Sequence, residues 1–241
     1  MNKHNLLGII SACAVAITLS NSAQAASFII DDFNVATSSA VSDDILGDGP
    51  NSGPSDIDDA NIVMNGAVDW TRILTAELLV GGFIETEVCH VCAAGHVTMA
   101  GPSNGIGIYT YSGPAIDLSG LTLLSFEWGA DLPGASVDMI FSDGSNMSTV
   151  ASWSSLAATG GSTPGDLVEQ APMGIAWGAV DPSAITDIQF VVDGVISLDS
   201  IIDNIVGTEP SAIPAIPVWG LILTMLGVIS VAGRQLRAYA R

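Results

Sequence analysis

Short apolar runs separated by polar turns fill the middle of the chain, between residues 27 and 205. The runs are rich in Val, Ile, Leu and aromatic residues, and Gly, Asn, Asp, Ser and Pro lie between them. Runs of this length and composition are typical of β-strands joined by tight turns. The pattern predicts strands over residues 27–30, 73–80, 97–99, 106–111, 121–128, 136–141, 149–153, 185–192 and 195–205.

Two details of the pattern favour antiparallel pairing. Residues 137–141 roughly alternate between polar and apolar, which is typical of a half-buried strand. The dipeptide Asp193-Gly194 is favoured in two-residue hairpin turns, so it predicts a hairpin at that point. No long segment shows a helical period with capping residues. We therefore predict an all-β fold, an antiparallel β-sandwich, for residues 26–207, a length that suits one core.

The N-terminus departs from this pattern. Lys3 and His4 precede an apolar stretch over residues 6–19, and Ala23-Gln24-Ala25 is a small-x-small cleavage site. This order is typical of a secretory signal peptide. We predict that the secretion machinery exports the chain and that signal peptidase removes residues 1–25.

The C-terminus is apolar and then basic. Residues 216–233 carry no charge, and as a helix they cover roughly 27 Å, close to the hydrocarbon thickness of a bilayer. Trp219 precedes most of this run, and Arg234, Arg237 and Arg241 follow it, as expected for a span whose basic end stays in the cytoplasm. We predict a transmembrane helix in the inner membrane, after a linker at residues 208–212. A plain membrane anchor is one interpretation.

The residues before the span suggest a second interpretation. Ile213-Pro214, followed by Trp219-Gly220, resembles the Ile-Pro-Thr-Leu-x-x-Trp-Gly motif of C-terminal sorting signals processed by exosortases in Gram-negative bacteria, with Ala and Ile at the Thr and Leu positions. The resemblance covers residues 213–241. It implies a protein that an exosortase-type enzyme cleaves near the motif and passes to the cell surface or extracellular matrix.

The predicted ectodomain is strongly acidic. Residues 26–207 contain 24 Asp and Glu residues against one basic residue, Arg72, a formal charge of −23. Such a surface repels nucleic acid, so nucleic-acid binding is not expected. It suits a soluble exported protein, or one that binds cations.

The two ends of the ectodomain carry a further resemblance. Phe28-Ile29-Ile30-Asp31-Asp32-Phe33 and a last strand with Leu-Asp and Asp-Asn-Ile are similar to jelly-roll modules of the carbohydrate-binding and galactose-binding-like kind. In these modules the first and last strands lie close and share a structural calcium. The resemblance implies a Ca²⁺ site at Asp31, Asp32, Asp199 and Asp203, with solvated strand ends as the alternative.

The mature chain keeps two cysteines, in Cys89-His90-Val91-Cys92. Because the exported compartment is oxidising, the spacing favours a small disulfide loop between them. A metal site with His90 and His96, or a redox-active pair, stays open.

Little in the sequence indicates catalysis. The chain lacks a Gly-x-Ser-x-Gly elbow, a His-Glu-x-x-His motif and a phosphate loop. Glu127, next to Trp128, is the first candidate for a glycosidase carboxylate, although Ser125-Phe126-Glu127-Trp128 also reads as a half-buried strand.

We therefore predict a non-enzymatic surface or matrix protein. One alternative is a module that binds exopolysaccharide, which exposed aromatic residues on one sheet face would favour. The other is a hydrolase of matrix glycans, which a cleft with two facing carboxylates would favour.

Overall fold

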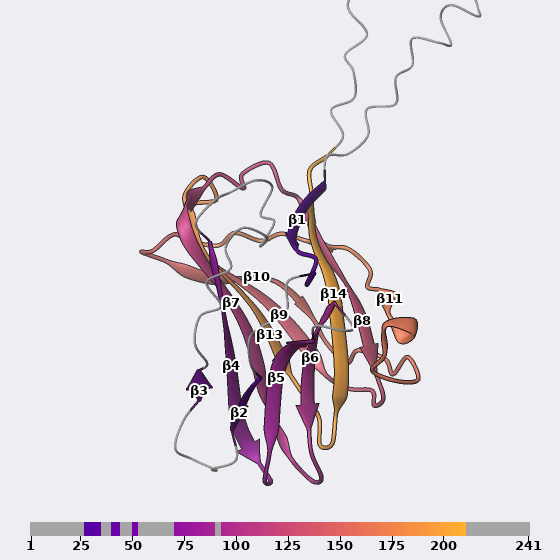
Figure 1. Ribbon diagram of the computed structural model, residues 1–241. Helices are drawn as coiled ribbons and strands as arrows, with labels where there is room; N and C mark the ends of the chain where they lie inside the picture. The colour runs from indigo at the N-terminus through magenta and orange to yellow at the C-terminus, as the bar shows by residue number, and fades with distance from the viewer. Residues whose placement is uncertain (1–26, 35–39, 44–49, 53–69, 90–92, 211–241) are drawn as a thin grey trace, which may run out of the picture. The chain divides into compact units, whose positions relative to one another are not determined.

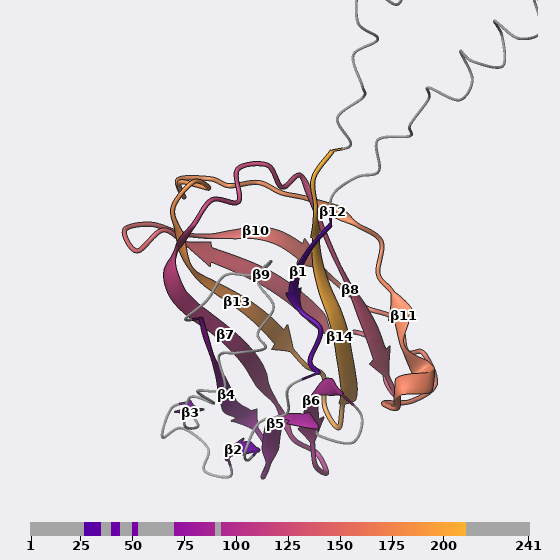
Figure 2. The ribbon, with the colours of Figure 1, turned by 45° about the horizontal axis from the view of Figure 1, so that its top comes forward.

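Two facing β-sheets build the domain (Figures 1 and 2). The computed structural model describes residues 27–34, 40–43, 50–52, 70–89 and 93–210. The strand pairings within both sheets are antiparallel, which confirms the predicted all-β sandwich. Within these residues no helix is long and apolar enough to cross a bilayer. The span predicted at residues 216–233 lies outside them.

The first sheet, called sheet A, has the order β11-β8-β14-β6-β5-β2. Strand β1 also joins β14, and β12 also joins β8. The bounds are β1 (Ser27–Asp31), β2 (Val41–Asp43), β5 (Ile84–Cys89), β6 (Ala94–Met99), β8 (Leu123–Ala130), β11 (Val168–Glu169), β12 (Met173–Gly174) and β14 (Asp199–Thr208). The first and last strands of the described residues are therefore hydrogen-bonded neighbours.

The second sheet, called sheet B, has the order β10-β9-β13-β7-β4-β3. A single 3₁₀ turn, η1, is the helical element of the described residues. The bounds are β3 (Asn51–Ser52), β4 (Thr71–Val80), β7 (Asn104–Ile116), β9 (Ser136–Ser142), β10 (Met147–Trp153), β13 (Ile185–Asp193) and η1 (Pro164–Asp166).

Side-chain alternation along the strands fills the space between the sheets. In β8, buried and half-buried positions alternate from Leu124 to Trp128, and the buried ones face sheet B. Phe126 packs edge-on against Trp153 and Phe190 of sheet B, with ring centroids 4.9 and 5.0 Å away. These T-shaped contacts, together with the aliphatic residues around them, hold the two sheets together.

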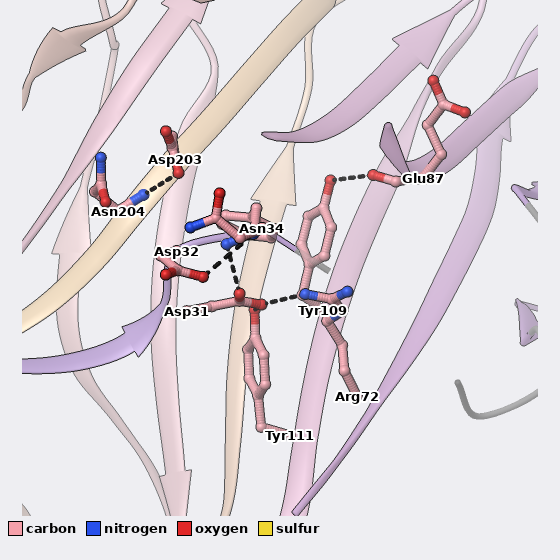
Figure 3. A network of polar contacts seen from close by, with 10 residues as sticks. Asp31, Asp32, Asn34, Arg72, Glu87, Tyr109, Tyr111, Asp203 and Asn204 are labelled. Atoms are coloured by element: carbon pink, nitrogen blue, oxygen red, sulfur yellow. Dashed lines mark hydrogen bonds and ion pairs between the residues drawn. The ribbon is translucent and has the colours of Figure 1, made fainter. Parts of the chain in front are cut away.

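A buried ion pair also joins the two sheets. Arg72 from β4 lies inside the sandwich, and its Nη1 is 2.5 Å from Oδ2 of Asp31 in β1. The hydroxyl of Tyr111 donates to the same oxygen at 2.8 Å, as Figure 3 shows. Burial acts to lower the pKa of Arg72, but the neighbouring charge of Asp31, followed by Tyr111, outweighs it and the pKa is raised. Arg72 is therefore charged, and its charge is used to hold β1.

The hairpin predicted at Asp193-Gly194 is wrong. Strand β13 ends at Asp193 in sheet B, whereas β14 starts at Asp199 in sheet A, so the chain crosses between sheets here. The N–H of Gly194 donates to the carbonyl of Gly105 at 3.1 Å, which ties the crossing to the start of β7. A Cβ on Gly194 would lie 2.0 Å from the end of the Met99 side chain, so a larger residue here would require Met99 to move.

Candidate functional site

An open pocket of about 280 Å³ lies on the outer face of sheet A, over β8, β11 and β14. Five of its seven lining residues are polar, and they supply carboxylates, an amide and hydroxyls. The lining residues are Ser125, Phe126, Glu127, Glu169, Asn204, Val206 and Thr208.

Strand alternation decides which side chains of β8 reach the pocket. Ser125 and Glu127 are half-buried and face outward, while the intervening Phe126 points inward. Trp128 is fully buried. Glu127 and Trp128 therefore face opposite sides of sheet A, and only Glu127 belongs to the site. The interpretation of Ser125-Phe126-Glu127-Trp128 as part of a half-buried strand is confirmed.

A β-bulge in β14 brings a second polar group to the pocket. The register with β8 shifts between Asp203 and Val206, and Asn204 has a φ of 48°. Asparagine tolerates this left-handed conformation better than most residues. The amide Nδ2 of Asn204 donates to Oε2 of Glu127 at 2.7 Å. The bulge thus fixes one carboxylate oxygen of the pocket.

Three carboxylates form a row across three neighbouring strands. Glu127 in β8 is the cross-strand partner of Asp203 in β14 and of Glu169 in β11. Neighbouring strands lie about 4.8 Å apart, so the row extends over roughly 10 Å. Like charges at opposed positions repel each other. This row is called the carboxylate row below.

The middle of β14 shows the effect of this crowding. Burial is the largest cause that raises the pKa of Asp203, and the charges of Glu127, Asp32 and Asp31 add to it. The backbone N–H of Asn204 donates to Asp203 at 2.7 Å and acts in the opposite direction. The net result is a pKa of about 6.

The structure brings together three of the four residues predicted to bind calcium. Asp31 and Asp32 lie at the end of β1, close enough for their charges to act on Asp203 (Figure 3). Asp199 is four residues away from Asp203 along β14, about 13 Å in an extended strand. The N–H of Asp199 instead donates to Asp131 at 2.9 Å.

The carboxylate of Asp31 is already engaged by protein donors. Its Oδ1 accepts the N–H of Phe33 at 2.7 Å, and its Oδ2 accepts from Arg72 and Tyr111. Within the described residues, no group of three or more His, Cys, Asp or Glu side chains is arranged to hold a metal ion. Calcium binding stays a prediction.

The cysteine pair is only partly visible. Cys89 ends β5, and the N–H of Ala93 donates to its carbonyl at 3.0 Å. Cys92 and His90 lie outside the described residues, so the disulfide stays a prediction. His96 is in β6, where burial is the largest effect and lowers its pKa against the charges of Glu87 and Asp199.

The predicted processing sites also lie outside the described residues. They comprise the signal peptide at residues 1–25, with Ala23 and Ala25, and the sorting motif over residues 213–220. Signal cleavage and sorting therefore stay predictions.

Aromatic residues do not form a binding platform on the described strands, because each of them there is buried. Phe83 and Trp177, which are partly buried, lie outside the strands. Sequence reasoning selected Glu127 but missed its partners Glu169 and Asn204. Their proximity depends on the pairing of strands that lie far apart in sequence.

No known protein family and no curated protein matches the sequence. Similar solved structures include several carbohydrate-binding modules and, over 55% of this chain, a glycoside hydrolase of family 43 from Bacillus subtilis. A family 11 module of a cellulosomal cellulase of Clostridium thermocellum is 15% identical, with a TM-score of 0.38 over 77% of this chain and 96% of that one. A family 29 module in complex with mannohexaose is 10% identical, with a TM-score of 0.36 over 77% and 92%.

The module TmCBM61 in complex with β-1,4-galactotriose is 10% identical, with a TM-score of 0.34 over 68% of this chain and 91% of that one. All three TM-scores are below 0.5. A likeness at this level gives no information about a ligand of this chain.

Proposed function

We propose that this chain is an exported, non-catalytic surface protein whose β-sandwich binds a glycan in the pocket of sheet A. The pocket itself is the observation that carries the proposal. It places the carboxylates of Glu127 and Glu169, the amide of Asn204 and the hydroxyls of Ser125 and Thr208 around one space. A sugar presents hydroxyls that donate to carboxylates and accept from amides, so the lining complements a polyol.

Size and charge narrow the ligand further. Pockets for small molecules usually start at about 300 Å³, so a space of about 280 Å³ suits one small unit of a longer chain. The acidic domain disfavours anionic polysaccharides, because the net charge of residues 26–207 is −23. A neutral or cationic polysaccharide of the extracellular matrix is the ligand class that fits.

A glycan array probed with the purified chain tests this proposal, followed by titration of any ligand found. Glu127→Ala removes the acceptor held by Asn204 and should weaken binding about tenfold, because a hydrogen bond to a charged group contributes about 1.5 kcal/mol or more. Glu77→Ala, on β4 of sheet B, is the matched control and should bind like the wild type. Absence of binding to any glycan, or equal loss in both variants, would refute the proposal.

The hydrolase alternative rests on the same carboxylates. Glu127 and Glu169 are directly opposite, and retaining glycosidases hold their two carboxyl groups about 5 Å apart. Release of reducing ends from a bound glycan separates the two functions. Release that Glu127→Gln and Glu169→Gln both abolish would establish a hydrolase, whereas binding without release supports the binding module.

A further inference from the structure

The pocket belongs to a sheet face on which negative charges gather. Outward positions of β5, β8, β11 and β14 carry acidic side chains. They are Glu85, Glu87, Glu127, Glu169, Asp199 and Asp203. His96, on the same face, has a lowered pKa and is neutral at pH 7. This set is called the acidic face below.

The described part of the chain holds no lysine or arginine that could neutralise the acidic face. Arg72 is the one such residue between positions 27 and 210. It is buried in the sandwich and paired with Asp31. The positive charge of Arg72 is therefore used to hold β1, and within the described residues no Lys or Arg remains to neutralise the carboxylates of the pocket.

The carboxylate row is the most concentrated part of the acidic face. Asp203, Glu127 and Glu169 are opposed across three strands, and the Asn204 amide is the neutral donor that reaches Glu127. Like charges at opposed positions destabilise a sheet. A ligand that brings a positive charge to the carboxylate row would relieve this repulsion, and the relief would favour binding. The raised pKa of Asp203, caused by burial and then by Glu127, agrees with this uncompensated charge.

We propose that the pocket recognises a glycan bearing a protonated amine, an amino sugar whose ammonium group lies at the carboxylate row. This inference rests on the proposed glycan binding and names the ligand class of that site. An ammonium carries three N–H donors and no acceptor, which suits a group of carboxylates better than a hydroxyl does. The ring hydroxyls then meet Ser125, Thr208 and the Asn204 amide.

Matched oligosaccharides test the inference. The purified chain is titrated with oligomers of glucosamine and with their N-acetylated counterparts, which share the backbone but lack the positive charge. The buffer is at pH 6.5, where Asp203 is mostly ionised because its pKa is about 6. We expect the amine form to bind about tenfold more tightly, the gain of one charge-assisted interaction.

Variants locate the effect. Glu127→Gln and Asp203→Asn keep the shape and remove one charge each, so each should reduce the preference for the amine form several-fold. Glu77→Gln removes one charge from the outer face of sheet B and should leave the preference unchanged. Thermal melting of each variant checks that it is folded.

The outcomes separate this inference from the proposed function. Equal or tighter binding of the N-acetylated form would refute the amine preference and leave glycan binding in place. Failure of both forms, and of every other glycan, would refute both. If Glu77→Gln reduced the preference for the amine form as much as Glu127→Gln does, the preference would reflect non-specific attraction of the amine to the acidic domain. The inference would then be wrong.

Discussion

Replacing Asp203 by Asn should stabilise the domain at neutral pH. The carboxylate of Asp203 is half-buried in β14. Burial, together with the negative charges of Glu127, Asp32 and Asp31, disfavours its ionised form and raises its pKa. Arg72, the cation nearest in this network, is paired with Asp31. Asn keeps the shape and the acceptor for the neighbouring backbone N–H, and it removes the charge.

The magnitude follows from the difference between a usual pKa of 3.8 and a folded-state pKa of about 6. Without solvent screening, this pKa difference corresponds to about 3 kcal/mol in the free energy of unfolding. Because the side chain is only half-buried, solvent screening reduces the effect to about 1 kcal/mol. The folded state binds the proton more tightly, so the wild type is relatively more stable below about pH 4 and loses this stability as the pH rises through 6.

Thermal melting of the wild type and the Asp203→Asn variant at pH 4 and pH 7 measures the effect. At pH 7 the variant should melt about 2–4 °C higher, the shift expected for 1 kcal/mol in a domain of this size. At pH 4 the two should melt together. Glu77→Gln controls for the general loss of one negative charge. A variant that is no more stable at pH 7, or that gains equally at pH 4, would refute this account of Asp203.

Four further predictions concern the ion pair, calcium, the cysteines and the tail. Arg72→Met should lose about 3–5 kcal/mol in urea unfolding, because it leaves Asp31 buried without its partner. If calcium binds, melting should rise with Ca²⁺ more than with Mg²⁺ at equal ionic strength, and Asp203→Ala should lose most of the response. Intact mass of exported protein should show two protons fewer than the reduced form, from a Cys89–Cys92 disulfide. Mass spectrometry of the surface form should find a chain that ends near the sorting motif.

Each of these predictions has a contradicting result. A loss below 1 kcal/mol in Arg72→Met would mean that the pair is not a main support of β1. Equal responses to both divalent ions would exclude the calcium site. Stoichiometric zinc that survives dialysis would replace the disulfide by a metal site. Recovery of only the intact chain, in the inner membrane, would reduce the tail to a plain anchor.

The apolar pattern predicted most of the long strands because their inward side chains repeat every second residue. It missed β5, where Glu85, Thr86 and Glu87 interrupt the apolar run. It also misjudged Asp193-Gly194, since a turn-forming dipeptide carries no information about which sheet the next strand joins. Local sequence reports local conformation, and the choice between sheets depends on packing across the core.

The site was less predictable than the fold. Glu127 could be selected from the sequence as a carboxylate in a strand. Its neighbours could not, because Glu169 and Asn204 meet it only through pairings that join β8 to β11 and β14. The bulge at Asn204 leaves no sequence signal beyond an asparagine, which is common in turns.

The position of the pocket beside the last strand has a mechanical consequence. The chain leaves the domain after β14, and Asn204, Val206 and Thr208 of that strand line the pocket. If the tail is anchored as the sequence predicts, a pull on a bound ligand reaches the anchor along β14 and need not cross the core. Strand β14 is paired with β8 on one side and, near its end, with β1 on the other, so this load shears many backbone hydrogen bonds at once. We expect the domain to resist tension along this path better than tension that peels an edge strand such as β10 or β2 from its sheet.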